Sequence, residues 1–313
     1  MINIGVMLKT ILNWFDNERA AQQQHSVEGD HIDLSRIIPF IALHVACLAV
    51  FYVGYSHTAL LVMVISYLIR MFAITAFFHR FFSHKTFKTF PWVQVVFAII
   101  GTTATQRGPL WWAAHHRNHH RYSDQDADVH APGKGFWESH MLWFLRKKNF
   151  PTNHGQVKDL TAVKSLYWID RYDMLFPVLY GLFLYLLGSW VATSYPSLGT
   201  SGGQFLVWGY FISTVLLAHV TFSINSIAHL VGKREYQTND NSKNNFVLAV
   251  LTLGEGWHNN HHCAPGSIRQ GFKGWQIDIS FYVLKCMEWC GLIWDVKYPN
   301  QQILNKKLIK VKP

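Results

Sequence analysis

Two long stretches of the chain contain no Lys, Arg, Asp or Glu. They cover residues 37–69 and 174–230, and a short turn-like segment interrupts each of them, at 54–58 and at 194–204. Because one membrane-spanning helix needs about 20 predominantly apolar residues, each stretch predicts a hairpin of two spans. The second span must continue past Arg70, whose long side chain can reach the membrane interface. The predicted spans are residues 37–55, 58–78, 174–193 and 205–226.

Two further segments are apolar but do not fit a span. Residues 89–106 carry no charge, yet they contain Pro91, Gly101, four Thr and two Gln. This composition predicts an interfacial or buried segment. Residues 1–15 have apolar side chains at helix-like spacing, which predicts an amphipathic interfacial helix.

The positive charges predict an orientation for the spans. Neither short loop contains Lys or Arg, and all 28 basic residues of the chain fall on the other side of the four-span arrangement. The positive-inside rule makes that side cytoplasmic, with both termini inside. The excess of 28 basic over 18 acidic residues therefore follows the membrane topology and does not indicate nucleic-acid binding.

The composition supports a membrane protein. Hydrophobic residues make up 50% of the chain and charged residues 15%, against roughly 25% charged residues in soluble proteins. Such a chain is not disordered, and four Cys without a CxxC pair exclude a disulfide scaffold. We expect an all-α integral membrane protein that forms a single domain over residues 1–313, with a cytosolic helical cap from residues 79–173 and 227–313.

Most of the 18 histidines fall in four short clusters, all on the predicted cytoplasmic side. Two clusters contain the pattern HxxHH, and residues at i, i+3 and i+4 share one face of a helix. The first cluster spaces its two histidines five apart, which requires a helix end or a distorted turn if both are to reach one centre. The candidate ligands are His79, His84, His116, His119, His120, Asn225, His229, His258, His261 and His262.

This set of ligands is too large for one metal ion. Structural zinc takes four ligands and catalytic zinc takes three with an open position, so the set predicts two metals. Imidazole suits Zn, Cu, Fe and Ni, and the ligand type alone does not name the metal. Asp124, Asp126 and Asp128 lack the Gly and Glu of a calcium loop. We expect these three aspartates to orient ligand imidazoles by hydrogen bonds, with His130 and His140 as further partners.

These motifs resemble a known family. HRFFSH, HHRNHH followed by RYSDQDADVH, NSIAH and GEGWHNNHH are similar to the histidine boxes of integral-membrane fatty acid desaturases, more narrowly of the stearoyl-CoA (delta-9) acyl-CoA desaturase branch. The resemblance runs from about residue 37 to residue 298. It implies four spans under a cytosolic cap and two iron ions. One iron would be bound by His79, His84, His116, His120 and His261. The other would be bound by His119, His229, His258 and His262, with Asn225 nearby through a water.

The resemblance also implies a reaction and its partners. The family inserts a cis double bond into a saturated acyl chain, uses O2 and two electrons, and releases water. Since we find no fused cytochrome b5 domain, a separate ferredoxin, rubredoxin, cytochrome or flavoprotein reductase must supply the electrons, and this absence favours a bacterial inner membrane. Membrane hydroxylases and alkane-type monooxygenases can use a similar centre and are the alternative. A metal transporter is disfavoured because most clusters lie outside the spans or at their ends.

The acyl carrier is less sharply predicted. The resemblance favours acyl-CoA, but the Arg-Asp pair that precedes the HRxHH box in acyl-CoA-using relatives is Ala114-His115 here. Carrier protein and phospholipid therefore stay open as carriers. Trp111 and Trp112 are candidates for the wall of an apolar acyl tunnel. The main predicted substrate contacts are Arg107, Trp143, Arg146, Lys147, Lys148 and Trp257, of which the basic residues would bind a phosphate or a polar headgroup.

Overall fold

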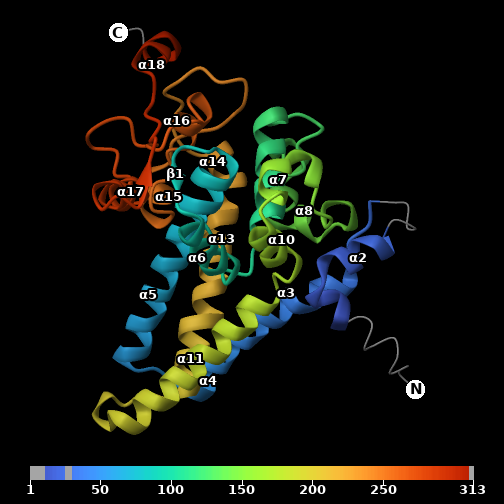
Figure 1. Cartoon of the computed structure of the whole chain (residues 1–313), viewed down its shortest axis with the longest axis vertical. Coiled ribbons are helices and arrows are strands. Elements are labelled where there is room, and N and C mark those ends of the chain that lie inside the picture. The colour runs from blue at the N-terminus through green and yellow to red at the C-terminus, as the bar shows by residue number, and fades with distance from the viewer. Residues whose placement is uncertain (1–10, 25–29, 310–313) are drawn as a thin grey trace.

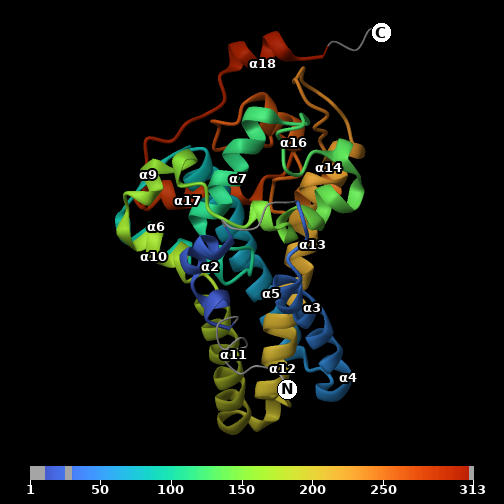
Figure 2. The ribbon, with the colours of Figure 1, turned by 90° about the vertical axis from the view of Figure 1, so that its right-hand side faces the viewer.

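The computed structural model describes residues 11–24 and 30–309 (Figures 1 and 2). It is mostly helical, with long helices at one end and a cap of shorter elements at the other. Four helical segments are long and apolar enough to cross a membrane: Arg36–Val53, His57–Ser83, Leu175–Ser194 and Gly202–Leu230. The all-α class and the four predicted spans are confirmed. The second and fourth helices continue further than predicted, into the first and third histidine clusters.

The first hairpin turns at the polar interruption seen in the sequence. Gly54 has a φ of 66°, which favours glycine, and Ser56 accepts a hydrogen bond from the backbone N–H of Ala59 at 3.1 Å, capping the next helix. Its elements are α3 (Leu34–Ala46), η1 (Cys47–Ala49), α4 (Val50–Val53), α5 (His57–Phe72) and the π-helical η2 (Ala73–Ser83).

The second hairpin packs closely against the first. A Cβ on Gly209 would meet Val62 Cγ1 at 2.8 Å, so glycine is what allows the backbones to approach at this point. The elements are α11 (Leu175–Ser194), η7 (Pro196–Leu198), α12 (Gly202–Gln204), the π-helical η8 (Phe205–Ile212), α13 (Ser213–Asn225) and α14 (Ile227–Leu230). In Figure 2, α11 and α3 lie on opposite sides of α12 and α13.

The cap consists of short helices with one small sheet, in which β1 (Lys88–Thr89) pairs antiparallel with β2 (Ile293–Trp294). Its first half contains α6 (Pro91–Thr102), α7 (Pro109–Tyr122), η3 (Pro132–Lys134), η4 (Glu138–Leu142), α8 (Trp143–Leu145), η5 (Lys147–Asn149), η6 (His154–Gln156), α9 (Lys158–Thr161) and α10 (Lys164–Arg171). Its second half contains α15 (Phe246–Leu251), α16 (His258–Cys263), α17 (Ile279–Trp289) and α18 (Gln301–Lys307).

The two weaker apolar segments have different outcomes. Residues 89–106 contain α6, which is only 12 residues long and packs its buried Gly101 against Phe78 of η2, in agreement with the prediction of a buried or interfacial segment. Residues 11–15 are helical and α2 (Asn17–Gln24) follows them. The remainder of the predicted N-terminal helix lies outside the described residues.

Candidate metal centre

Four helical segments bring the predicted histidine ligands together where the long helices meet the cap. The end of η2 supplies His79, and His84 follows directly after it. The helix α7 carries HHRNHH in its last turns, α14 carries His229, and α16 begins at His258. The HxxHH patterns of α7 and α16 thus lie on helices, as predicted.

The five-residue spacing of His79 and His84 is accommodated by a π-helix. The backbone N–H of His84 donates to the carbonyl of His79 at 3.2 Å, which is the i to i+5 hydrogen bond of this wider turn. The two imidazole centroids are 4.9 Å apart as a result. The distorted turn that the spacing required is therefore present.

The nine histidines form two groups, and within each group one possible ligand atom per residue lies within 4.8 Å of all the others. The five-histidine group contains His79, His84, His116, His120 and His261. The four-histidine group contains His119, His229, His258 and His262. This division is the one that the family resemblance implied. Asn225 is the last residue of α13 and lines the same cavity as four of the ligand histidines.

At the pair His119 and His262 the imidazole geometry fits a metal ion and does not fit a hydrogen bond between the rings. Nε2 atoms of different histidines approach one another at 2.8 to 3.3 Å. His119 and His262 each have Nδ1 at 2.8 Å from a carboxylate oxygen, so Nδ1 donates and the Nε2 of each neutral ring carries a lone pair. Two lone pairs 3.3 Å apart repel unless a cation lies between them. Two such cations would satisfy both groups.

Carboxylates orient four of the nine imidazoles. Asp128 accepts from His119, Asp240 accepts from His262, and Asp124 Oδ1 lies 3.1 Å from Nδ1 of His229. Glu255 forms the fourth pair, with Nδ1 of His79. A carboxylate on the outer nitrogen fixes the tautomer of a ligand and makes it more basic.

The prediction for the aspartate run is correct at Asp128, whereas Asp124 lies beside His229 without a hydrogen bond of good geometry. Among the described residues no histidine contacts the side chain of Asp126, which is exposed. The sequence prediction missed Asp240 and Glu255. Glu255 is the acidic residue within the GEGWHNNHH motif, so the sequence does place it near the ligands. Nothing in the sequence around Asp240 marks it as a partner of His262.

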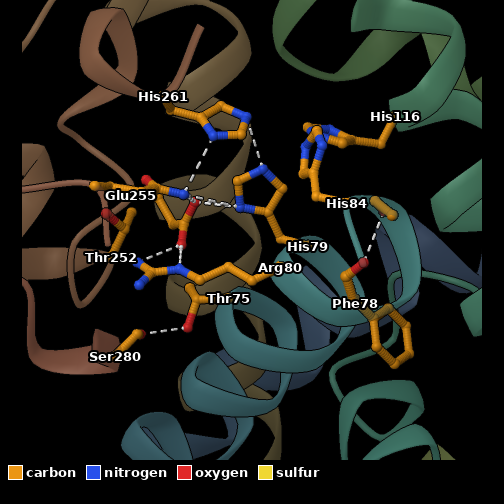
Figure 3. Close-up of polar contacts among 12 residues, drawn as sticks. Thr75, Phe78, His79, Arg80, His84, His116, Thr252, Glu255, His261 and Ser280 are labelled. Carbon is orange, nitrogen blue, oxygen red and sulfur yellow. Dashed lines mark hydrogen bonds and ion pairs between the residues drawn. The ribbon is translucent and has the colours of Figure 1, made fainter. Parts of the chain in front are cut away.

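A buried arginine holds Glu255 in place (Figure 3). Arg80 follows His79 in η2 and donates from Nε and Nη2 to Glu255 at 3.1 and 3.0 Å. Its Nη2 also donates to Asp278 at 2.9 Å, and Arg80 is 1% exposed. The same helical turn therefore presents one side chain to the metal centre and the next to the carboxylate that orients it.

The protein environment favours the neutral form of six of these imidazoles. Burial and neighbouring histidines hold the pKa values of His84, His116, His120, His258 and His261 well below the usual 6.5. Burial likewise lowers the pKa of His262 to about 4. Neutral imidazole is the form that binds metals.

A cavity of about 750 Å³ runs from the metal centre into the membrane part. This volume is within the roughly 300–1,000 Å³ that is typical of small-molecule sites. Four of the ligand histidines reach its wall: His79, His116, His119 and His258. Much of the remaining wall is apolar and comes from α3, α11, η8 and α13.

The structure separates the predicted substrate contacts into two sets. Arg107, Trp111, Trp112 and Trp143 line the cavity, whereas Trp257 does not and donates its Nε1–H to the carbonyl of Ile277 at 2.7 Å. The residues of the basic run, Arg146 to Lys148, are not part of the cavity wall either, although Leu145 just before them is. Arg146 pairs with Glu138 and Asp30, and Lys148 pairs with Asp30, while the backbone N–H of Lys147 donates to the carbonyl of His31.

The fold and site define a class of protein: a helical membrane protein with two histidine groups that could hold metal ions and with an adjoining cavity. Residues 38–273 match the family model described as "Fatty acid desaturase". The chain belongs to the fatty acid desaturase family, and its histidine-rich, membrane-embedded character agrees with the sequence resemblance. Members of this family act on fatty acyl chains in membranes.

Individual relatives cover most of the chain. It is 36% identical to Delta-9 acyl-lipid desaturase 1 of Arabidopsis thaliana, over 86% of this chain and 85% of the relative. It is 36% identical to Acyl-CoA C20 Delta5-desaturase of Anemone leveillei, over 74% of this chain and 71% of the relative. It is 34% identical to sn-2 palmitoyl-lipid 9-desaturase of Nostoc sp. (strain 36), over 79% of this chain and 84% of the relative.

Proposed function

We propose that this chain is an O2-dependent, non-haem di-iron desaturase that inserts a cis double bond, at the delta-9 position, into a saturated fatty acyl chain. The observation that carries the proposal is the pair of histidine groups at the wall of a cavity that is mostly apolar. Residues 1–313 would form a single desaturase domain. The nine histidines would hold the two irons, and Asn225 would contact the second one through a water.

The two irons, when bound, would activate O2 for removal of hydrogen from two adjacent methylene groups, which ordinary acid–base side chains cannot do. The balanced reaction converts –CH2–CH2–, O2, two electrons and two protons into –CH=CH– and two waters. The protein holds the acyl chain in the apolar cavity and shields the reacting carbons from bulk water. The carboxylates hold the Nδ1–H of their imidazoles, so that each Nε2 lone pair faces inward. A separate redox protein would deliver the electrons.

For the acyl carrier we propose a membrane lipid, with acyl-CoA as the second candidate. The relatives named above include two acyl-lipid desaturases and one acyl-CoA desaturase. The basic run at Arg146 and Lys148 is neutralised by nearby carboxylates, and an Arg-Asp pair is missing before the second histidine box. Both observations weaken a CoA-binding surface at these positions.

We further propose that both termini and the metal centre face the cytoplasm, in a bacterial inner membrane. The two short loops that join the paired helices contain no Lys or Arg, whereas the other segments outside the four helices are rich in basic residues, and this distribution supports the orientation.

A fatty acid profile tests the proposal. A host without delta-9 monoenes would express the chain, the ligand variant His119→Ala, or the control His57→Ala, which changes an exposed histidine far along the chain from the clusters. We expect a new delta-9 cis-monoene with the wild-type chain and with His57→Ala, and none with His119→Ala. Hydroxylated acyl chains in place of monoenes would support the monooxygenase alternative instead.

A further inference from the structure

The cavity ends in a polar region where α3 and α11 begin. Arg36 is the first residue of the first apolar span, and Met174 directly precedes α11. Arg36 and Arg107 both line the cavity here, and their side chains are 16% and 20% exposed. The ends of spans lie at the depth of lipid headgroups. This end of the cavity is therefore at the membrane interface, with two guanidinium groups in its wall.

Both guanidinium groups pack on one aromatic ring. The Cζ atoms of Arg36 and Arg107 lie 2.7 and 3.8 Å from the ring centroid of Phe150. This arrangement brings two like charges close together, and one carboxylate compensates each of them from its Nε side, Asp33 at Arg36 and Asp173 at Arg107. Arg107 has a φ of 72°, in the left-handed region that ordinary residues avoid. Such strained residues cluster at ligand-binding positions.

The two arginines are not fully satisfied by the protein. Asp33 accepts from Nε of Arg36 at 2.7 Å, but none of the described residues accepts from its two terminal nitrogens. Arg107 donates to the side chain of Asn17 and to the carbonyl of Phe150, with Asp173 at 3.3 Å from its Nε. Both carboxylates thus approach the Nε side of a guanidinium, and the terminal nitrogens of Arg36 are left for a ligand in the cavity.

We propose that Arg36 and Arg107 bind the phosphate group of the acyl carrier while its acyl chain occupies the cavity. Guanidinium groups match the geometry of phosphate oxygens and form strong charge-assisted hydrogen bonds with them. The inference rests on the proposed desaturase function and refines it: the substrate carries a phosphate. The position at the membrane interface favours a phospholipid headgroup as the source. The phosphates of CoA offer the same chemistry from the aqueous side.

The test measures desaturation by the full-length, iron-loaded chain in lipid nanodiscs with an electron donor. Three stearoyl donors would be compared: phosphatidylglycerol, monogalactosyldiacylglycerol, which has no phosphate, and stearoyl-CoA. The variants are Arg36→Gln and Arg107→Gln. The control is Arg171→Gln, because Arg171 also packs near aromatic rings and pairs with Asp16, but does not line the cavity.

We expect Arg36→Gln and Arg107→Gln to raise KM for phosphatidylglycerol by about tenfold or more with kcat nearly unchanged. The galactolipid should show no such change, and Arg171→Gln should behave as wild type with every donor. Arg36→Lys should restore part of the affinity. A KM effect confined to stearoyl-CoA would keep the phosphate contact and make CoA its source. Equal effects on phosphatidylglycerol and galactolipid, or none, would overturn the inference.

A measurement on the unmodified chain covers the case in which the variants fail to fold. Short-chain phosphatidic acid should inhibit the wild-type enzyme at about a tenfold lower concentration than the matched diacylglycerol, which lacks the phosphate. Equal inhibition would refute the phosphate contact. If the wild-type chain forms no monoene from any donor, the proposed function itself fails. If it forms monoenes equally well from donors with and without a phosphate, only the phosphate contact fails.

Discussion

Asp128 provides the sharpest test of how the protein prepares its metal ligands. Its side chain is fully buried and accepts from Nδ1 of His119 at 2.8 Å. It also accepts from the backbone N–H of Asp124 and of His130, at 3.1 and 3.2 Å. The substitution Asp128→Asn preserves the shape but removes the charge. An amide N–H facing Nδ1–H then favours the wrong tautomer of His119, in which Nε2 carries the proton and cannot bind a metal.

The size of the effect follows from these contacts. Loss of a carboxylate behind a ligand imidazole lowers metal affinity about 10- to 100-fold, which is roughly 1.4–2.7 kcal/mol. The acidity of Asp128 is a second indication that its carboxylate interacts with these rings. Burial raises the pKa of Asp128, but the neighbouring His130 and His119 lower it overall below the usual 3.8. Because His119 belongs to the four-histidine group, one metal of the two should be weakened and the other retained.

The assay is the metal content of purified protein after dialysis against a graded series of a weak chelator. The control is Asp126→Asn, which makes the same change two residues away, at an exposed side chain. We expect wild type and Asp126→Asn to retain two irons per chain under conditions in which Asp128→Asn retains one. Equal retention by Asp128→Asn and Asp126→Asn would refute the orienting role.

Three further predictions concern stability. Asp170 accepts from the backbone N–H groups of Leu110 and Trp111, both at 2.9 Å, and thereby caps the start of the helix that carries HHRNHH. Asp170→Ala should therefore lower the free energy of unfolding by about 1–3 kcal/mol. Asp170→Asn, which keeps the acceptor, should cost less in the same denaturation series, and an equal loss would contradict the capping role. Burial lowers the pKa of His262 from 6.5 to about 4 in the folded protein, so the unfolded chain takes up the proton first as the pH falls. The free energy of unfolding of the metal-free protein should therefore decrease as the pH falls from 6.5 to 4, by up to about 1.4 kcal/mol per pH unit for this residue. A thermal-unfolding series that is flat over this pH range would count against neutral buried imidazoles. Finally, Gly101→Ala should lower the free energy of unfolding by about 1–3 kcal/mol, because the new Cβ would lie 2.3 Å from the ring of Phe78. The control Gly133→Ala should leave the free energy of unfolding unchanged, because the space around Gly133 is open.

The sequence predicts those features that depend on local periodicity. Uncharged runs of span length locate the four long helices, and the HxxHH spacing places three imidazoles on one face of α7 and of α16. Asp128 could be expected beside His119 because both come from one short segment. The extra residues of the second span, up to Ser83, were missed because a π-helix continues through HRFFS, and hydropathy alone does not register that continuation.

Features that depend on contacts between distant segments could not be predicted in the same way. Asp240 reaches His262 from a loop with no regular pattern, and Arg80 joins Glu255 across 175 residues of sequence. Arg36 looks in the sequence like an ordinary charge at the end of a span. Only the fold shows that it faces a cavity together with Arg107, while the more conspicuous basic run at Arg146 is occupied by its own carboxylates.

The central claim is that this site removes hydrogen from an acyl chain and does not add oxygen to it. The most direct measurement is single-turnover reaction of the reconstituted enzyme with a stearoyl lipid under 18O2, followed by mass spectrometry of the acyl product. We expect a cis-monoene two mass units lighter than the substrate chain, with no 18O in the lipid. An acyl product that retains one 18O atom as a hydroxyl group, without a double bond, would contradict the account.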